Sequence, residues 1–308
     1  MLDVGLCMTV RDEAANIVDC LAPIKDLFAE ILVIDTGSVD ETHDLLRDQL
    51  GIDVECLELF ENECLALSSA RNQGFDKLKT PWLMSLDADE RIDRRQLIDL
   101  FGQDDTDLPA GLFFRWDTDF GDGELIEDYK LALFRADHRH RGLIHDTPQP
   151  SLRDSGEHAD WHPDLCIRHF PSAVLQHKKD LTYSWRLECA LAREPDWMRY
   201  HWFGGQMAYR RGDNETAGKF LRAVHAARPA LFPVESLNAS MVLASVYARR
   251  GDREATLAVV CDALDHYESV ADDFEVRINF RLRPWLDNAR ELAASDRLAA
   301  IKPYAFPY

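Results

Sequence analysis

Three acidic side chains occur within four positions in the stretch WLMSLDADERI, residues 82 to 92: Asp87, Asp89 and Glu90. They follow an apolar run of strand length, so they are expected at the end of a buried strand. Neighbouring carboxylates repel one another unless a cation compensates them. Asp87 and Asp89 are separated by one residue and can turn toward a common point, as ligands of Mg²⁺ or Mn²⁺ must. The pattern predicts a divalent-cation site, whereas an ordinary solvated acidic turn is the alternative.

The elements that would position these acids alternate along the first part of the chain. Short apolar runs at residues 4–10, 31–35, 54–60 and 82–87 predict strands, and residues 13–28, 38–50 and 64–78 predict helices between them. Ser38 followed by Glu41 is typical of a helix start. Continuous apolar strands separated by helices predict a parallel sheet covered on both faces. Such a sheet binds ligands beyond the carboxyl ends of its strands, where Asp35 and Asp87 stand.

The pattern changes after residue 110. Residues 111–120, 130–136 and 165–170 are apolar enough to predict further strands. Residues 138–165 are rich in His, Asp, Pro and Arg without periodicity, which predicts long loops near a site. From residue 176 onward the chain is predicted to be helical. The domain prediction is therefore an α/β domain at 1–175 and an all-α domain at 176–308.

Two stretches of the helical part are similar to each other. YRRGDNETA and YARRGDREA align Gly212 with Gly251 and Ala217 with Ala255. An aromatic residue, a Gly-Asp turn and a small residue at a close approach predict helical hairpins like tetratricopeptide repeats. An ordinary helical bundle is the alternative.

Composition limits the classes of partner. The 308 residues carry a formal net charge of −20, so phosphate backbones and anionic lipid surfaces are repelled. Seven scattered cysteines without metal-binding spacing favour a reducing compartment. The N-terminal residues do not resemble a signal peptide, and no apolar segment is long enough to cross a bilayer. We therefore expect a cytoplasmic protein that binds neither nucleic acid nor membrane.

Four blocks in fixed order carry a family resemblance. LCMTVRDE at 6–13, VIDTGSVDET at 33–42, ARN at 70–72 and LDADE at 86–90 resemble the family 2 glycosyltransferases of the GT-A fold, especially bacterial members with C-terminal tetratricopeptide repeats. The resemblance implies metal-dependent, inverting transfer of a sugar from a nucleotide-diphosphate sugar, with a UDP-sugar as the expected donor. The acceptor is unidentified: a glycan, a lipid-linked glycan, a peptide or a small molecule. A homodimer formed through the helical domain is a further expectation.

The resemblance also implies roles for donor-site residues. The first loop and the end of the second strand would hold the nucleoside, through Thr9, Arg11, Glu13 and Asp35. A buried carboxylate suits a base N–H or ribose hydroxyls, although Asp35 could instead cap the following helix. Arg71 would be the cation near the donor, with a surface ion pair as its alternative.

Two later blocks, GLIHDTP and IRHFPS, resemble the acceptor side of the family. They imply Asp146 as the general base for the acceptor hydroxyl and His169 as a metal ligand beside Asp87 and Asp89. Asp89 is expected to serve catalysis as well as metal binding. His145 would support Asp146 or contact a phosphate.

This chain departs from the family pattern at three positions. It has Asp12, Asp146 and Pro171 where such proteins more often have Asn, Glu and Gly. These changes leave open a catalytically decayed domain that acts as a protein-binding scaffold. A nucleotidylyltransferase is less favoured, because the first loop lacks the glycine-rich, basic character that a triphosphate needs.

Overall fold

The structure is a computed structural model that describes residues 2–57, 67–121, 123, 125–171 and 173–303. Contacts divide it into two compact units, Met1–Arg186 and Leu187–Phe306, apart from the last two residues. Helix α6, Ala173–Arg193, contains this division and also the predicted boundary at 175/176. The exact domain boundary stays a prediction.

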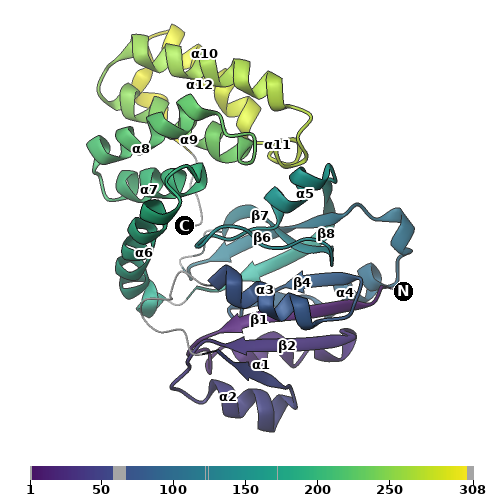
Figure 1. The fold of residues 1–308 in the computed structure, drawn as a ribbon. Coiled ribbons are helices and arrows are strands. Elements are labelled where there is room, and N and C mark those ends of the chain that lie inside the picture. Colours follow the sequence, from purple (N-terminus) through teal and green to yellow (C-terminus); the bar gives the residue numbers. More distant parts are fainter. Residues whose placement is uncertain (1, 58–66, 122, 124, 172, 304–308) are drawn as a thin grey trace. The chain divides into compact units, whose positions relative to one another are not determined.

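The first unit is built on an eight-stranded sheet (Figure 1). Its strands are β1 Val4–Val10, β2 Glu30–Asp35, β3 Val54–Cys56, β4 Trp82–Ser85, β5 Glu90–Ile92, β6 Gly111–Asp119, β7 Leu125–Arg135 and β8 Ala159–His169. They follow the order β3-β2-β1-β4-β7-β6-β8-β5. The β3-β2-β1-β4 part is parallel, as predicted. The remainder is mixed, because β7 is antiparallel to both β4 and β6, and β5 is antiparallel to β8.

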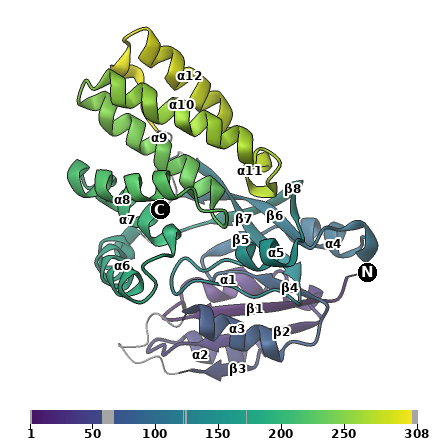
Figure 2. The same cartoon turned by 45° about the horizontal axis from the view of Figure 1, so that its top comes forward.

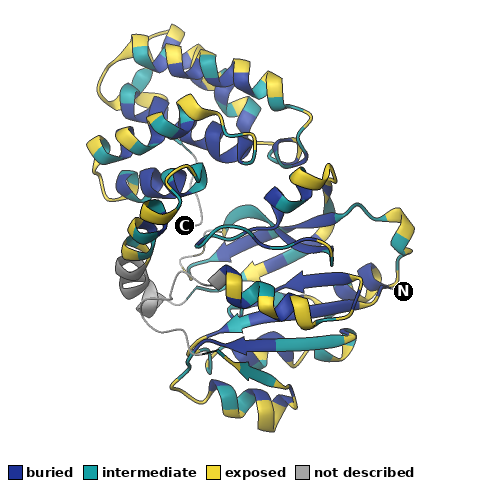
Figure 3. Ribbon diagram, in the orientation of Figure 1, coloured by how far each residue is buried: buried dark blue, intermediate teal, exposed yellow. Residues whose placement is uncertain are grey.

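Each face of the sheet has its own apolar core. Alternate side chains of β1, such as Leu6 and Met8, join a cluster with helices α1 (Ile17–Leu21) and α4 (Arg94–Phe101). Cys7 points to the opposite face and packs in a cluster with helix α3 (Leu67–Lys77). Figure 3 shows the central strands in the colour of buried residues. The alternation of β1 therefore leaves the end of this strand covered by α3 on one face and by α1 on the other.

Several predicted elements differ in detail. The helix at 38–50 begins later, as α2 (Thr42–Asp44) followed by a π-helix at Leu45–Leu50. Ser38 does not cap it: the Thr42 N–H donates to Asp40 Oδ1, whereas Ser38 Oγ accepts from the Asp12 N–H. Part of the third predicted strand and the start of the third helix fall on residues 58–66, which lie outside the described residues.

The prediction of long loops at 138–165 is correct for residues 138–148, which form no helix or strand, and wrong for the rest. Helix α5 spans Gln149–Ser155 and the first half of β8 also lies in this region. Pro148 precedes the helix and Gly156 ends it in the left-handed region, at φ 73°. Polar side chains in ADWHPD hide the alternation of the strand. Strand β7 also begins earlier than predicted, at Leu125 and not at residue 130, because its polar first half pairs with β6.

The second unit is entirely helical in its described part. After α6 it contains α7 Met198–Arg210, α8 Asn214–Ala227, α9 Pro233–Arg249, α10 Arg253–Val270, α11 Phe274–Ile278 and α12 Leu282–Ala294. Helices α9, α10 and α12 run side by side (Figure 2).

The two predicted hairpins share one turn. Gly212 after α7 and Gly251 after α9 both adopt positive φ, at 79° and 73°. An aspartate follows each glycine and caps the next helix. The alignment of Ala217 with Ala255 was off by one residue. Counted from the turn glycine, the position equivalent to Ala217 is Thr256, and both side chains are fully buried.

Candidate donor-binding and catalytic site

The carboxyl ends of β1, β2 and β4 meet at one edge of the sheet because these strands are parallel neighbours. Val10 is level with Asp35, and Cys7 is level with Ser85. The loops that follow these strands therefore lie together, as a ligand site at this edge requires. Thr9 is the last but one residue of β1, and its side chain lies on the face of the sheet that α3 covers.

Arg71 on α3 is the central cation of this edge. Its Nη1 donates to Ser85 Oγ at 2.7 Å, and its Nη2 lies 3.5 Å from Thr9 Oγ1 and 3.4 Å from Asp87 Oδ1. Its side chain is only 12% exposed. Burial opposes the charged form, but Asp146 and Asp87 outweigh it and raise the pKa of Arg71. The guanidinium is therefore a permanent positive charge held at the ends of β1 and β4.

Asp146 lies on the other side of this guanidinium. Its Oδ2 accepts a 2.7 Å hydrogen bond from His140 Nδ1 and lies 3.5 Å from Arg71 Nε, which makes an ion pair but no hydrogen bond. Burial alone would raise the pKa of Asp146, but Arg71 and His140 bring it well below its usual range. Burial lowers the pKa of His140. Asp146 is therefore a fixed anion that holds Arg71 in place.

A lysine that the motifs did not indicate lies between two of the opening acids. Lys130 Nζ on β7 donates to Asp87 Oδ2 at 2.8 Å and to both Glu90 oxygens at 2.7 Å. Burial raises the pKa of Glu90, and Lys130 partly opposes this. For Asp87 the balance is reversed, because Lys130 and Arg71 outweigh burial and lower its pKa. The repulsion among the acids is thus compensated by side chains of the chain itself.

The Asp89 side chain lies beside His169 of β8. Its Oδ2 lies 3.5 Å from His169 Nε2, while Thr118 Oγ1 lies 3.0 Å from His169 Nδ1. A Thr118–Nδ1 hydrogen bond orients the ring so that Nε2 points to Asp89. Carboxylate oxygen and imidazole nitrogen are ligands that Mn²⁺ accepts, so this pair fits a divalent ion. Within the described ranges, no three His, Cys, Asp or Glu side chains are close enough together to hold a metal.

The first loop is tied to the loop after β2. Asp12 has φ 57°, and its Oδ1 accepts from the Val39 N–H at 2.8 Å. Asparagine and aspartate both tolerate this left-handed conformation, so the departure at this position preserves the loop geometry. Asp35 is buried, and its Oδ1 accepts from the Gly37 and Ser38 N–H groups. Asp35 thus shapes its own turn, whereas Arg11 is exposed to solvent.

The predicted site residue His145 has surroundings different from those of its neighbour Asp146. His145 has φ 49° and stacks on Tyr183 at a centroid distance of 5.6 Å, while its neighbour Asp146 is held by His140 instead.

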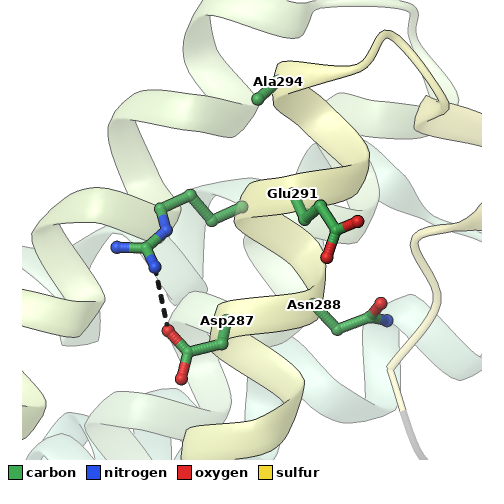
Figure 4. Close-up of a pocket in the computed structure, with 5 residues that line it drawn as sticks. Asp287, Asn288, Glu291 and Ala294 are labelled. Carbon is green, nitrogen blue, oxygen red and sulfur yellow. Dashed lines mark hydrogen bonds and ion pairs between the residues drawn. The ribbon is translucent and has the colours of Figure 1, made fainter.

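A separate surface pocket occurs on α12 of the helical unit (Figure 4) and contains none of the predicted site residues. It is lined by Asp287, Asn288, Arg290, Glu291 and Ala294. Among the described helices, none combines the length and the apolar character that a membrane span requires.

Sequence reasoning missed Lys130 and His140. Both stand in stretches without a motif: Lys130 begins an apolar strand pattern, and His140 lies in a region predicted as loop. The sequence signal that could have indicated Lys130 is a single lysine in one predicted strand, together with acidic residues at the end of another predicted strand. Using it requires knowledge that β7 pairs with β4 in antiparallel register, which the sequence does not provide.

One family model matches most of the first unit. It is the model of glycosyl transferase family 2, and it matches residues 6–154. The predicted fold class, a GT-A type α/β sheet followed by an all-α region with repeat-like hairpins, is confirmed.

Two curated relatives are similar to parts of the chain. A TPR repeat-containing protein of Synechococcus elongatus is 31% identical over 180 residues, which cover 58% of this chain and 42% of that protein. The SPbeta prophage-derived glycosyltransferase SunS of Bacillus subtilis is 36% identical over 81 residues, which cover 26% of this chain and 18% of SunS. The chain therefore spans less than half the length of either relative.

Among solved structures, S. aureus TarS 1–349 is similar, with a TM-score of 0.47 and 12% identity, over 97% of this chain and 92% of that chain. TarS 1–349 in complex with UDP-GlcNAc gives a TM-score of 0.44 at 12% identity, over the same shares of the two chains.

Proposed function

We propose that this protein is a glycosyltransferase that moves a sugar from a nucleotide-diphosphate sugar to an acceptor hydroxyl, with inversion at the anomeric carbon. The family 2 match over residues 6–154 supports the reaction class. The observation that carries the proposal is Arg71, a largely buried guanidinium held by two carboxylates at the strand ends where a parallel sheet binds its ligands.

Arg71 suits the diphosphate of the donor. A guanidinium is always charged and presents several N–H donors in a fixed plane, which matches phosphate oxygens. The ion pairs to Asp87 and Asp146 fix its position before the donor binds, so little reorganisation is needed when negative charge develops on the leaving phosphate.

The nucleoside is assigned to the loops after β1 and β2. Thr9 lies near the end of β1, Arg11 and Glu13 lie on the loop that follows it, and Asp35 ends β2 beside them. The Asp12–Val39 hydrogen bond joins the two loops into one surface. We assign uridine as the base because the resemblance implies a UDP-sugar. His145 is assigned to the edge of this site.

A divalent ion, Mn²⁺ or Mg²⁺, is assigned to Asp89 and His169. When bound, such an ion would act as a Lewis acid that stabilises the leaving diphosphate. The chain itself supplies the orientation of its ligands, since the Thr118 contact with His169 Nδ1 turns Nε2 toward Asp89.

Asp146 is assigned as the acceptor of the proton from the incoming hydroxyl. Its lowered pKa keeps it ionised, so it can accept a proton throughout the neutral range. The same lowered pKa makes it a weak base. Its contact with Arg71 gives it a second task, which is to hold the cation that meets the donor.

The six described cysteines are all free, which supports the proposal of a reducing, cytoplasmic location.

A thermal-shift experiment with UDP and UDP-sugars, with and without Mn²⁺, tests this function. Ligand at 100 times its Kd stabilises the folded state by ~2.7 kcal/mol, which corresponds to about 5–11 °C in a domain of this size. Arg71→Gln should abolish the UDP shift, whereas Arg95→Gln, which changes an exposed arginine of α4, should preserve it.

Donor hydrolysis then separates an enzyme from a scaffold. We expect Mn²⁺-dependent release of UDP from the donor that gives the largest shift, and its loss in Asp89→Asn but not in Asp99→Asn, which changes an exposed acid. UDP binding without any turnover, with every acceptor class offered, would favour the decayed scaffold.

A further inference from the structure

The two carboxylate oxygens of Asp146 have different surroundings. Oδ2 lies 2.7 Å from His140 Nδ1 and 3.5 Å from Arg71 Nε. Among the described residues Oδ1 has no hydrogen-bond partner, but it is not one of the unpaired polar atoms that the protein shuts off from solvent. The side chain keeps 10% of its surface exposed. Oδ1 is therefore the oxygen of Asp146 that a substrate hydroxyl can reach.

His140 meets Asp146 as a neutral ring. An ionised carboxylate can only accept a hydrogen bond, so the hydrogen between the two side chains belongs to Nδ1. Nε2 is buried and has no hydrogen-bond partner in the described part of the chain, and the rings of Phe75 and Phe134 lie 5.5 and 5.6 Å from the imidazole. A proton on Nε2 would bury an unpaired N–H and a charge. His140 is therefore suited to orient Asp146 and poorly suited to relay a proton.

The backbone of His140 is held as firmly as its ring. The Asn72 side chain on α3 donates to the His140 carbonyl at 2.8 Å and accepts from the His140 N–H at 3.0 Å. Asp146 returns to His140 along the chain because Arg141 and Thr147 exchange two backbone hydrogen bonds, at 3.0 and 3.2 Å. These contacts fix both ends of the His140–Asp146 hydrogen bond in the absence of any substrate.

We propose that His140 is a positioning residue that occupies Oδ2 of Asp146 and thereby directs Oδ1 to the acceptor hydroxyl. In the transfer step the acceptor oxygen forms its bond to the anomeric carbon, the proton of the hydroxyl passes to Oδ1, and the electron pair of the broken glycosidic bond leaves with the diphosphate. The Nδ1 hydrogen stays on His140 throughout. The inference rests on the proposed function, because it concerns the reaction assigned to Asp146.

The role of His140 should appear in the rate and not in the affinity for the donor. Without the bond to Oδ2 the carboxylate can rotate, and a small misplacement of a catalytic group can cost up to about 100-fold in rate. Arg71 keeps its contact with Asp87 at 3.4 Å, so the cation assigned to the diphosphate stays in place. Loss of the His140 N–H should therefore lower kcat and leave UDP binding nearly unchanged.

Two substitutions of similar shape test this role. Asparagine and leucine both remove the imidazole, but only asparagine offers an N–H near the position of Nδ1. The measured rate is Mn²⁺-dependent release of UDP, with water as the acceptor, from the UDP-sugar that gives the largest thermal shift. We expect His140→Leu to lower kcat by about tenfold or more and His140→Asn to restore it to within about threefold of the unmodified protein. If His140 only filled space between two phenylalanines, leucine would be the better substitute, so a kcat in His140→Leu equal to or above that in His140→Asn refutes the proposal.

Combination with Asp146→Asn shows whether His140 acts through this carboxylate. Asp146→Asn should lower kcat by about 100-fold or more, as removal of a general base does. Adding His140→Leu should then cost less than about threefold further, because the group that it positions is already lost. A full additional loss would mean that His140 acts elsewhere and would overturn the proposal.

His138→Leu is the matched control, because it changes a buried histidine of the same segment that faces Glu157 instead. It should leave kcat within about threefold of the unmodified protein. A loss equal to that in His140→Leu would indicate a general effect of the segment and count against the proposal.

His140→Phe covers the case in which the smaller side chains leave a cavity and those variants fail to fold. It keeps a ring beside Phe75 and Phe134 but has no N–H for Oδ2, so the same loss of rate is expected. UDP binding measured in parallel separates the two levels. Absence of UDP release by the unmodified protein refutes the proposed function and this inference with it, whereas normal UDP binding and release together with an unchanged kcat in His140→Leu or His140→Phe refutes this inference alone.

Discussion

Replacement of Lys130 by methionine is expected to destabilise the first unit by about 3 kcal/mol. Glu90 is fully buried and both of its oxygens lie 2.7 Å from Nζ, so the substitution leaves a buried carboxylate without its main partner. Removal of one partner from a buried ion pair costs roughly 3–5 kcal/mol. We use the lower end because the Lys130 side chain is 18% exposed, so water partly replaces it.

The loss should depend on pH. Burial already raises the pKa of Glu90 above its ordinary value of 4.5, and without Lys130 this effect is less opposed. A folded-state pKa above the unfolded value gives a stabilising contribution that is present below the unfolded pKa and is lost as pH rises through the folded pKa. The deficit of Lys130→Met relative to the parent should therefore be larger at pH 8 than at pH 5.

Urea unfolding followed by circular dichroism measures both effects. Lys130→Met/Glu90→Gln should recover much of the stability, because no unpaired charge remains. Lys77→Met is the control, since its exposed pair with Glu55 is worth less than about 1 kcal/mol. A loss below about 1 kcal/mol in Lys130→Met, or no recovery in the double variant, would show that the Lys130–Glu90 pair is not a buried constraint.

Three further predictions concern other parts of the structure. The pKa of Asp146 lies below its ordinary value of 3.8, so its stabilising contribution is present above pH 3.8 and is lost on acidification. Asp146→Asn should therefore flatten the fall in the free energy of unfolding between pH 5 and pH 2. An unchanged slope in this variant would contradict the pairing of Asp146 with Arg71 and His140. A Cβ at Gly205 would lie 2.6 Å from a buried leucine of α8, whereas one at Gly204 meets its nearest neighbour at 3.4 Å. Gly205→Ala should therefore lower the melting temperature of the helical unit, with a cost of about 1–3 kcal/mol, while Gly204→Ala should be neutral or stabilising; equal effects would argue against this close approach. Asp12→Ala should cost about 1–2 kcal/mol through loss of the Val39 hydrogen bond and a less tolerated φ, and Asp12→Asn should restore the stability measured by urea unfolding.

Much of the α/β unit could be predicted because its first half has simple patterns. β1, β2 and β4 are continuous apolar runs separated by helical stretches, which is the pattern of a buried parallel sheet. The second half was harder to predict. β8 and the start of β7 are polar and partly exposed, so their pairing with β6 gives no period-two signal in the sequence.

The parallel strands and helix α3 bring several of the motif residues together at one edge of the sheet. Arg71 contacts Thr9, Asp87 and Asp146, which are far apart in the sequence. The π-helix at Leu45–Leu50 and the late start of α2 at Thr42 could not be predicted, because hydrogen bonds of Asp40 to Thr42 and to Ala14 of the neighbouring loop decide where that helix begins.

The sequence by itself determined which chemical groups this protein can use: a row of acids after a buried strand, an arginine on the preceding helix and a histidine on a late strand. These follow from the order of apolar and polar residues along the chain, which sets where each strand ends. Only the tertiary structure decided how the acids divide. The antiparallel pairing of β7 with β4 places Lys130 between Asp87 and Glu90, and the pairing of β5 with β8 sets Asp89 beside His169. Strand pairing over long separations depends on the packing of the whole sheet, and local sequence carries little record of it.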